Sequence, residues 1–363
     1  PSQAAHGGSQ SDGRRTCSAR GCGPPGDHCG VDVSCAPEAR LRRGVGAGVV
    51  GQALMGGGDT ESLENPEPTE LDATEFARVG LGHGLFFDPG LSGAGDVSCS
   101  SCHEPAQFGA DGLARSEGTG GALADRNSPS VFNAALKERQ FWDGRAQAPE
   151  EQASGPLFAA NEMGQTGEGL LEHVRAAWAE EFELAFPGED GPTLEQVTLA
   201  LASYERMLPR RSRFDRFIDG DRGALSRQER RGYRIFRRNC TDCHAGAGAG
   251  GTDYRQLGED VPLPQDRRED QGLFEVTGDP SDQMVFMVPS LRNVSETGPW
   301  FHDGSVDSLE EAVRLMSRHQ LDRKFSSAQV RAIVSFLDTL TAEEVQPWAH
   351  EDWDAEAVSG HLG

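Results

Sequence analysis

The sequence lacks a long apolar segment and has few basic residues. None of its 363 residues lies in a run that approaches the ~20 apolar residues of a transmembrane helix, so we predict no membrane span. Asp and Glu number 58 against 34 Lys and Arg, which gives a net charge of −24 at pH 7. Such a surface repels nucleic acid and anionic lipid and attracts cationic proteins, although solubility or adaptation to salt would produce the same imbalance.

Strand signals are scarce, and the beginning of the chain has little that would form a core. Residues 1–69 are rich in Gly, Ser and Pro, lack aromatic residues and show no helical periodicity, which predicts a disordered extension. Four cysteines fall in this extension: Cys17, Cys22, Cys29 and Cys35. Two disulfides, free thiols and a metal site are all compatible with their spacing, so we assign them no function.

Two short stretches of the chain repeat one another. Each has the pattern Cys-x-x-Cys-His, formed by Cys99, Cys102 and His103 and by Cys240, Cys243 and His244. Two thiols one helical turn apart can form thioethers with the vinyl groups of one porphyrin, and the adjacent imidazole can bind its iron. A zinc or redox Cys-x-x-Cys pair is the alternative, but two complete copies favour two covalently bound haem c groups.

The haem motifs also indicate a cellular compartment. Covalent attachment of this kind takes place in oxidising surroundings outside the cytoplasm, where disulfides also persist. We therefore expect a periplasmic or otherwise extracytoplasmic bacterial protein. No clean export signal accompanies this expectation, because the apolar stretch at residues 44–58, which follows Arg40, Arg42 and Arg43, is too rich in glycine for a leader.

Helical periodicity predominates after residue 69 and predicts a mostly α fold. We expect a helix capped by Thr69, helices over residues 170–186 and 194–208, a helix capped by Ser226 that leads to the second haem motif, and helices over residues 309–316 and 330–340. The predicted architecture is two cytochrome c-like haem domains packed together. They cover residues 70–222 and 223–342, and a polar tail follows at 343–363.

Seven motifs occur in an order that resembles the bacterial di-haem cytochrome c peroxidase and MauG family. They are Leu85–Pro89, Ser98–His103, Arg126–Pro129, Phe141–Arg145, Glu162–Gly164, Val288–Asn293 and Phe301–Ser305. The resemblance covers about residues 70–342 and leaves the N-terminal extension outside.

The resemblance implies that the first haem reacts with peroxide. His103 would be its proximal ligand, Glu162 the acid–base residue over the open face of the iron, and Gln152 a neighbour of Glu162. Splitting an O–O bond requires a proton to move from one oxygen to the other, which a carboxylate can accomplish if burial moves its pKa toward neutrality. Trp142 would lie between the haems and relay electrons, whereas without the resemblance it would be a core residue.

By the same resemblance, the second haem would store an electron. His244 would be its proximal ligand and Met316 its distal ligand, whose thioether raises the reduction potential. Met316 also shares a helical face with Leu309, as a core residue would, and Met284 and Met287 are rival ligands.

A calcium ion between the two domains is also implied. Asn127, together with the main-chain carbonyl oxygens of Thr297 and Pro299, matches the calcium site of the family. Carbonyl oxygens are ligands that calcium accepts readily.

One feature departs from the family pattern. Many members carry a distal His after the first haem motif that caps the iron in the resting oxidised enzyme. The corresponding residue here is Thr119, and no His lies between His103 and His173. We therefore predict an open, five-coordinate or water-bound first haem without reductive gating. MauG-type enzymes share the open site but have Tyr where this chain offers Met316.

Taken with the resemblance, these features favour a peroxidase that reduces hydrogen peroxide to water with two electrons from a small c-type cytochrome or cupredoxin. The acidic surface suits a basic donor of this kind. The second hypothesis is a MauG-like enzyme that uses peroxide to oxidise Trp or Tyr side chains of a partner protein. The third is a non-catalytic electron-transfer cytochrome. The oligomeric state is open, with a homodimer as one option.

Overall fold

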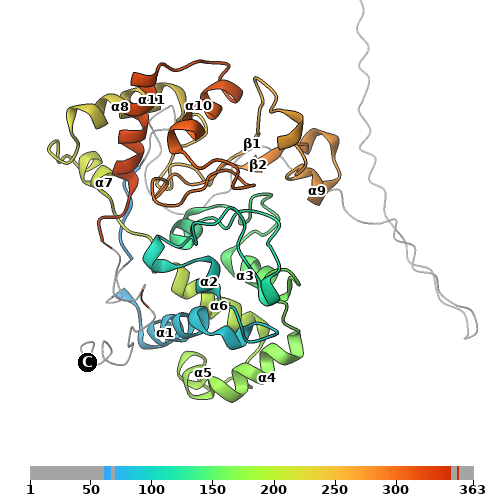
Figure 1. Cartoon of the computed structure of the whole chain (residues 1–363). Coiled ribbons are helices and arrows are strands. Elements are labelled where there is room, and N and C mark those ends of the chain that lie inside the picture. The colour runs from blue at the N-terminus through green and yellow to red at the C-terminus, as the bar shows by residue number, and fades with distance from the viewer. Residues whose placement is uncertain (1–60, 67–69, 345–349, 351–363) are drawn as a thin grey trace, which may run out of the picture. The chain divides into compact units, whose positions relative to one another are not determined.

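The computed structural model describes residues 61–66, 70–344 and 350. This part of the chain consists mainly of helices joined by long loops (Figure 1). The α-helices are α1 (Ala73–Phe87), α2 (Cys99–Cys102), α3 (Pro149–Phe158), α4 (Gly167–Ala177), α5 (Ala179–Ala185), α6 (Leu194–Glu205), α7 (Arg213–Ile218), α8 (Arg227–Asn239), α9 (Phe274–Thr277), α10 (Leu309–His319) and α11 (Ser327–Leu337). The predicted mostly α fold is confirmed.

Short 3₁₀ helices and two strands complete the secondary structure. The 3₁₀ helices are η2 (Pro89–Leu91), η3 (Pro105–Gln107), η4 (Thr119–Gly121), η5 (Val131–Leu136), η6 (Gln265–Arg267), η7 (Pro280–Asp282) and η8 (Asp338–Leu340). Strands β1 (Tyr254–Gln256) and β2 (Val285–Met287) pair antiparallel, with Tyr254 opposite Met287. Among the described residues, no helix has the length and apolar character needed to cross a bilayer.

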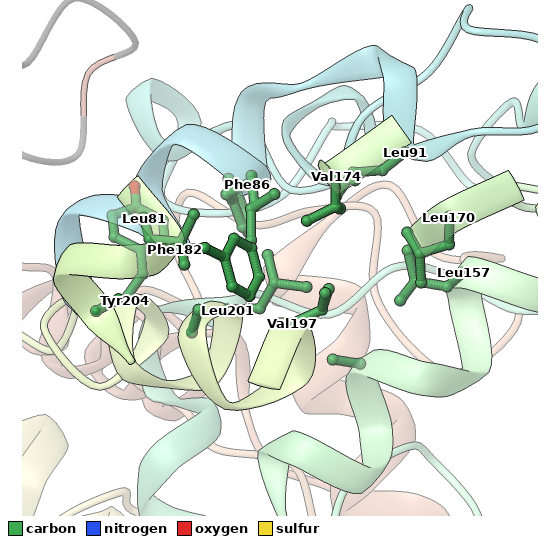
Figure 2. Packing of buried hydrophobic residues seen from close by; sticks show 14 of the residues in the cluster. Leu81, Phe86, Leu91, Leu157, Leu170, Val174, Phe182, Val197, Leu201 and Tyr204 are labelled. Atoms are coloured by element: carbon green, nitrogen blue, oxygen red, sulfur yellow. The ribbon is translucent and has the colours of Figure 1, made fainter. Parts of the chain in front are cut away.

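The helices around the first haem motif share one apolar core. Helix α1 packs against α5 and α6, and α3 packs against α6. Apolar residues at helical spacing face inward, as Figure 2 shows for Leu81 and Phe86 of α1 and for Val197, Leu201 and Tyr204 of α6. Burial of each such side chain stabilises the fold by roughly 1.5–3 kcal/mol.

A second core surrounds the other haem motif and is largely aromatic. Helix α8 packs along α11, and α7 lies against η8 (Figure 1). Phe236 of α8 and Phe336 of α11 have ring centroids 4.9 Å apart, and Phe214 of α7 meets Phe336 edge to face at 5.2 Å. This core holds the C-terminal end of α8, where Cys240 follows.

Each core contains one close helix crossing at a glycine. A Cβ at Gly82 of α1 would overlap the carbonyl oxygen of Ala200 in α6, and a Cβ at Gly232 of α8 would overlap that of Ala332 in α11. Only a residue without a side chain allows the two backbones to approach this closely. The two halves of the chain therefore have equivalent helix crossings.

Several helix boundaries differ from the predicted ones. Asp72 caps α1 by accepting hydrogen bonds from the N–H groups of Thr74 and Glu75, while the predicted cap, Thr69, lies outside the described residues. The helix predicted over residues 170–186 is interrupted at Trp178, whose indole N–H donates to Asp88 at 2.7 Å. Ser226 caps α8 as predicted, through Glu229.

Residues 61–66 depart from the predicted disorder. Leu63 is buried, and its N–H donates to Asp215 Oδ1 at 2.7 Å. Asp215 forms a buried ion pair with Arg292, whose Nη2 also donates to the carbonyl oxygen of Glu61. The rest of the predicted extension, including its four cysteines, and nearly all of the predicted tail lie outside the described residues. The domain boundaries stay predictions.

We expect Gly232→Ala to destabilise the fold by about 1–3 kcal/mol, because the new methyl group would force α8 and α11 apart. Chemical denaturation followed by circular dichroism measures the loss. Gly167→Ala is the matched control, because that glycine lies in the first turn of α4 with open space around it and should tolerate alanine. Equal stability of the two variants would contradict the close crossing.

Candidate functional site

The first haem motif opens into a cavity of about 640 Å³. Helix α2 places Cys99 and Cys102 one turn apart, and His103 follows at its C-terminal end. All three residues line the cavity. The cavity is thus bordered by two thiols and an imidazole from a single helical turn, which is the donor set that a covalently bound haem requires.

A second cavity, of about 250 Å³, adjoins the second haem motif. Cys240, Cys243 and His244 line it at the C-terminal end of α8. The two motifs therefore occupy equivalent positions, each beside its own cavity.

The imidazoles of both motifs are oriented by main-chain carbonyl groups. The Nδ1–H of His103 donates to the carbonyl oxygen of Gly109, and that of His244 donates to Ala249, both at 3.3 Å. This arrangement leaves each Nε2 with a free lone pair for a metal. Burial lowers the pKa of both side chains, that of His244 to about 4, so they are neutral at pH 7 and able to bind iron.

The cysteines of both motifs do not favour the zinc or redox alternative. Burial raises the pKa of Cys99 and Cys240 to about 12 and that of Cys102 to about 11. Zinc binding and disulfide exchange both require thiolates. In the described part of the chain, no group of three or more His, Cys, Asp or Glu residues is arranged to hold a metal ion.

Glu162 and Gln152, the residues that the sequence predicts for acid–base chemistry, both line the first cavity. Gln152 lies on α3, and Glu162 on the loop between α3 and α4. Burial raises the pKa of Glu162; the positive charge of Arg145 opposes this rise, and the negative charge of Asp125 adds to it. The pKa of Glu162 is therefore shifted in the direction that favours proton transfer near neutral pH.

Thr119, the residue at the position where the sequence comparison of motifs predicted a missing distal His, lies on a loop that supports Glu162. The Thr119 N–H donates to the carbonyl oxygen of Glu162 at 2.6 Å, and its hydroxyl donates to Asp96 at 2.7 Å. Among the described residues that line the first cavity, His103 is the single histidine.

The second cavity brings Met316 and His244 to the same space. Met316 lies on α10, and the neighbours on its helical face, Leu309, Ala312 and Val313, line the same cavity. This face therefore points toward the cavity.

The rival methionines have different surroundings. Met287 of β2 also lines the second cavity, whereas Met284 packs with Leu263 and Phe286 in a separate cluster. Met287 therefore remains an alternative to Met316 by position, and Met284 is the weaker of the two rivals.

Trp142 lies at the boundary between the two cavities and lines both. Its indole N–H donates to the carbonyl oxygen of Asn127 at 2.9 Å, and its own carbonyl oxygen accepts from Met287 N–H at 2.9 Å. Trp142 thereby links the first haem loop to β2, so its ring is fixed between the two sites.

The three residues predicted to bind calcium line the second cavity together. The side-chain amide of Asn127 donates to the carbonyl oxygen of Leu113 at 2.9 Å, which leaves its Oδ1 available to a cation. The carbonyl groups of Thr297 and Pro299 lie on either side of the cis peptide bond between Gly298 and Pro299. These oxygen donors are compatible with calcium.

Sequence reasoning missed an ionic network centred on Arg126. Its guanidinium contacts Asp143 at 2.5 Å, Asp270 at 2.6 Å and Glu275 at 3.3 Å. Arg126 and Asp143 belong to motifs that the sequence singled out, but Asp270 lies 144 residues away and carries no local signal. The network joins the first haem loop to the segment that precedes α9.

Two further buried groups of the first cavity were also missed. Burial raises the pKa of Glu205 to about 7, although the charges of Lys137 and Arg206 oppose this rise. Burial lowers the pKa of Lys137 to about 8. Neither residue belongs to a recognisable motif, so only their position in the folded chain identifies them.

Two cavities, each bordered by a Cys-x-x-Cys-His motif in a helical frame, define a protein with two haem sites. A family model described as di-haem cytochrome c peroxidase matches residues 76–223. Cytochrome c551 peroxidase of Nitrosomonas europaea is 40% identical over 301 residues, which cover 81% of this chain and 89% of the relative. The methylamine utilization protein MauG of Methylorubrum extorquens is 33% identical, over 78% of this chain and 82% of the relative.

A solved structure supports the same assignment. The crystal structure of a MauG-like protein associated with microbial copper homeostasis has a TM-score of 0.69 and 27% identity, and it covers 84% of this chain and 100% of its own. The chain belongs to the di-haem cytochrome c peroxidase and MauG family, whose cofactors are haem groups. It is an oxidoreductase of the peroxidase class, because cytochrome c551 peroxidase of Nitrosomonas europaea, at 40% identity, is more similar to it than MauG of Methylorubrum extorquens, at 33%.

We expect Arg126→Gln to destabilise the protein by about 2–3 kcal/mol at pH 7, because Asp270 would lose its cation and Asp143 would keep only its ion pair with Arg145. Burial raises the pKa of Asp270, but its hydrogen bonds and the charge of Arg126 outweigh burial and hold the pKa below its usual value. The stabilisation is therefore present at neutral pH and lost as the pH falls below about 4.

Denaturation of both proteins between pH 3 and pH 7 tests this expectation. The exposed Arg175, on α4, provides Arg175→Gln as the control that should leave stability unchanged. A stability difference between Arg126→Gln and the unmodified protein that stays constant down to pH 3 would contradict the role assigned to the network.

Proposed function

We propose that this chain is a c-type peroxidase that reduces hydrogen peroxide to water. The observation that carries the proposal is the convergence of His103, Glu162 and Gln152 on one cavity. In this proposal both haems are covalently bound, the first through Cys99 and Cys102 and the second through the equivalent cysteines of its own motif.

Glu162 moves a proton between the two oxygens of peroxide. The haem iron, when bound, supplies the site of peroxide reduction and passes on two electrons. Glu162 as a carboxylate takes a proton from one oxygen and returns it to the other. Overall, one peroxide molecule, two electrons and two protons give two water molecules. The amide of Gln152 orients the peroxide. The positive charge of Arg145 limits the rise in the pKa of Glu162.

The first haem keeps an open face in this proposal. Thr119 supplies no imidazole, and its hydrogen bonds to Asp96 and to the carbonyl group of Glu162 fix the loop in a supporting role. Without a ligand to displace, peroxide has access before the second haem is reduced.

His244 and Met316 would hold the second haem as its two ligands. The Met316 thioether would favour the reduced state, so this site would store an electron. Trp142, which lines both cavities, relays that electron to the first haem. Calcium bound by Asn127, Thr297 and Pro299 would keep the relay residue and its neighbours in place.

The remaining parts of the proposal concern partners and compartment. The electrons come from a small basic redox protein, a c-type cytochrome or a cupredoxin, attracted by the net charge of −24. The enzyme works in the periplasm or another extracytoplasmic compartment, because its haems are attached covalently, and a homodimer is compatible with this activity.

A MauG-like activity is the second candidate function. It is favoured by Thr119, which leaves the first haem open in the same way, and opposed by Met316, where MauG-type enzymes have Tyr. A non-catalytic electron-transfer cytochrome is not favoured, because a buried carboxyl with a raised pKa beside the first haem would then have no role.

We expect Glu162→Gln to lower peroxide turnover by about 10²–10⁴-fold with both haems retained, because the amide cannot accept a proton. Because the Glu162 carboxylate must accept a proton and burial raises its pKa, activity of the unmodified enzyme should be lost as the pH is lowered, and this loss should begin at a higher pH than for an ordinary carboxylate. Steady-state assays with a reduced c-type cytochrome across the pH range measure both effects.

Glu168→Gln is the control for this assay, because Glu168 is exposed in the first turn of α4 and should not affect turnover. Undiminished turnover of Glu162→Gln would reject the acid–base role. Turnover that depends on a specific protein substrate, with no activity toward a small donor, would favour the MauG-like function instead.

We expect Met316→Leu to abolish the near-infrared band of methionine-ligated haem and to lower the reduction potential of the second haem. Electron paramagnetic resonance of the first iron should remain that of an open or water-bound site in both proteins. Persistence of the band would assign the ligand to Met287, and a first iron capped by a sulfur or an amine would contradict its open face.

A further inference from the structure

Lysine is rare in this chain, and one lysine occupies a singular position. Of the 34 basic residues, Lys137 and Lys324 are the two lysines and the others are arginine. Lys324 is exposed, whereas Lys137 lines both cavities. A compact ammonium group is therefore placed where the two haem sites adjoin, in a chain that uses arginine almost everywhere else.

The backbone and stem of Lys137 are held by the loop that follows the second haem motif. Lys137 comes directly after η5, and the next residue, Glu138, donates its N–H to the carbonyl oxygen of Gly251 at 3.0 Å. Gly251 has φ +89°, and a Cβ there would lie 3.1 Å from Cγ of Lys137. The aliphatic stem thus packs flat on the glycine, which fixes the direction of the side chain.

Lys137 lines the first cavity, and its ammonium acts on the charged groups there without a direct protein partner. In the described part of the chain, no ion pair or side-chain hydrogen bond holds this group. Its charge lowers the pKa of His103 and opposes the rise in the pKa of Glu205, and both of these residues line the first cavity. A desolvated cation that no carboxylate contacts directly is costly, so this position favours an anion in the cavity.

We propose that Lys137 is a positioning residue that binds a propionate carboxylate of the first porphyrin and thereby raises the reduction potential of that haem. Each haem carries two propionates, which supply the anion that the cavity lacks. The inference rests on the proposed haem attachment. A fixed positive charge beside the porphyrin favours the state with one more electron, so the first haem accepts electrons from its neighbour more readily.

The shape of the lysine side chain suits this role. Its ammonium is a point charge with three donors on a flexible stem, and it can reach a single carboxylate oxygen. Glu205 is the alternative partner, since it lies in the same cavity, but no ion pair joins it to Lys137 among the described residues. The two partners predict different results in a double variant.

Spectroelectrochemical titration of the two haems tests the proposal. Lys137→Met keeps the stem and removes the charge, and we expect the equilibrium constant for reduction of the first haem to fall about tenfold, which is about 59 mV for a one-electron couple. The reduction potential of the second haem should change less. Lys137→Arg should restore the potential, and Lys324→Met, the exposed control, should leave both potentials unchanged.

Three results would overturn the proposal. They are unchanged potentials in Lys137→Met, a larger shift at the second haem than at the first, and a drop in Lys137→Arg as large as in Lys137→Met. If Lys137→Met fails to retain the first haem, retention in Lys137→Arg supports the propionate contact, and loss in both variants contradicts it.

The double variant Lys137→Met with Glu205→Gln separates the two partners. If Lys137 binds a propionate, the drop caused by Lys137→Met persists when Glu205→Gln is the background. If the drop disappears, Glu205 is the partner and the proposal is wrong. Haem content is measured first in the unmodified protein, because fewer than two covalently bound haems would refute the proposed function independently of Lys137.

Discussion

Each haem site depends on one close crossing of two helices at a glycine. Helix α1 crosses α6 at Gly82, and α8 crosses α11 at Gly232, in each case with no room for a side chain. In the second half of the chain, α8 runs from this crossing directly into Cys240, so the crossing sets where the thiols and His244 emerge. In the first half, the same packing fixes α1 and α6 around the loop that carries α2. A frame built this way holds each motif against its own cavity.

Burial in these cavities determines which form each ionisable group takes. The same loss of water that keeps His244 neutral also keeps the cysteine thiols protonated and raises the pKa of Glu162. These effects agree with one chemistry, because metal binding through a neutral imidazole and proton transfer by a weakly acidic carboxyl are needed together. Lys137 is affected by burial in the opposite direction, as a cation must be, and it retains its charge at neutral pH with a pKa of about 8.

Contacts at the boundary between the two sites connect distant parts of the chain. The indole N–H of Trp142 donates to Asn127, and its carbonyl oxygen accepts from Met287, so this residue is hydrogen-bonded to both halves of the chain. Arg126 adds charged contacts to Asp143 and Asp270 across the same boundary. Lys137 packs on Gly251 there. The residues proposed for electron transfer and for charge compensation therefore lie beside the ionic contacts of this boundary, so a change in one is expected to affect the others.

The sequence by itself determined the features that depend on residues close together in the chain. Two thiols and an imidazole in Cys-x-x-Cys-His spacing indicate haem whatever surrounds them, and Ser226 caps α8 through a bond to a residue three positions away. Motif order identified the family, and with it Glu162 and Trp142 as site residues. Tertiary structure alone decided the rest. The break at Trp178, the pairing of β1 with β2, the partner of Arg126 at Asp270 and the position of Lys137 all depend on residues brought together from distant segments, and local periodicity and spacing carry no information about such contacts.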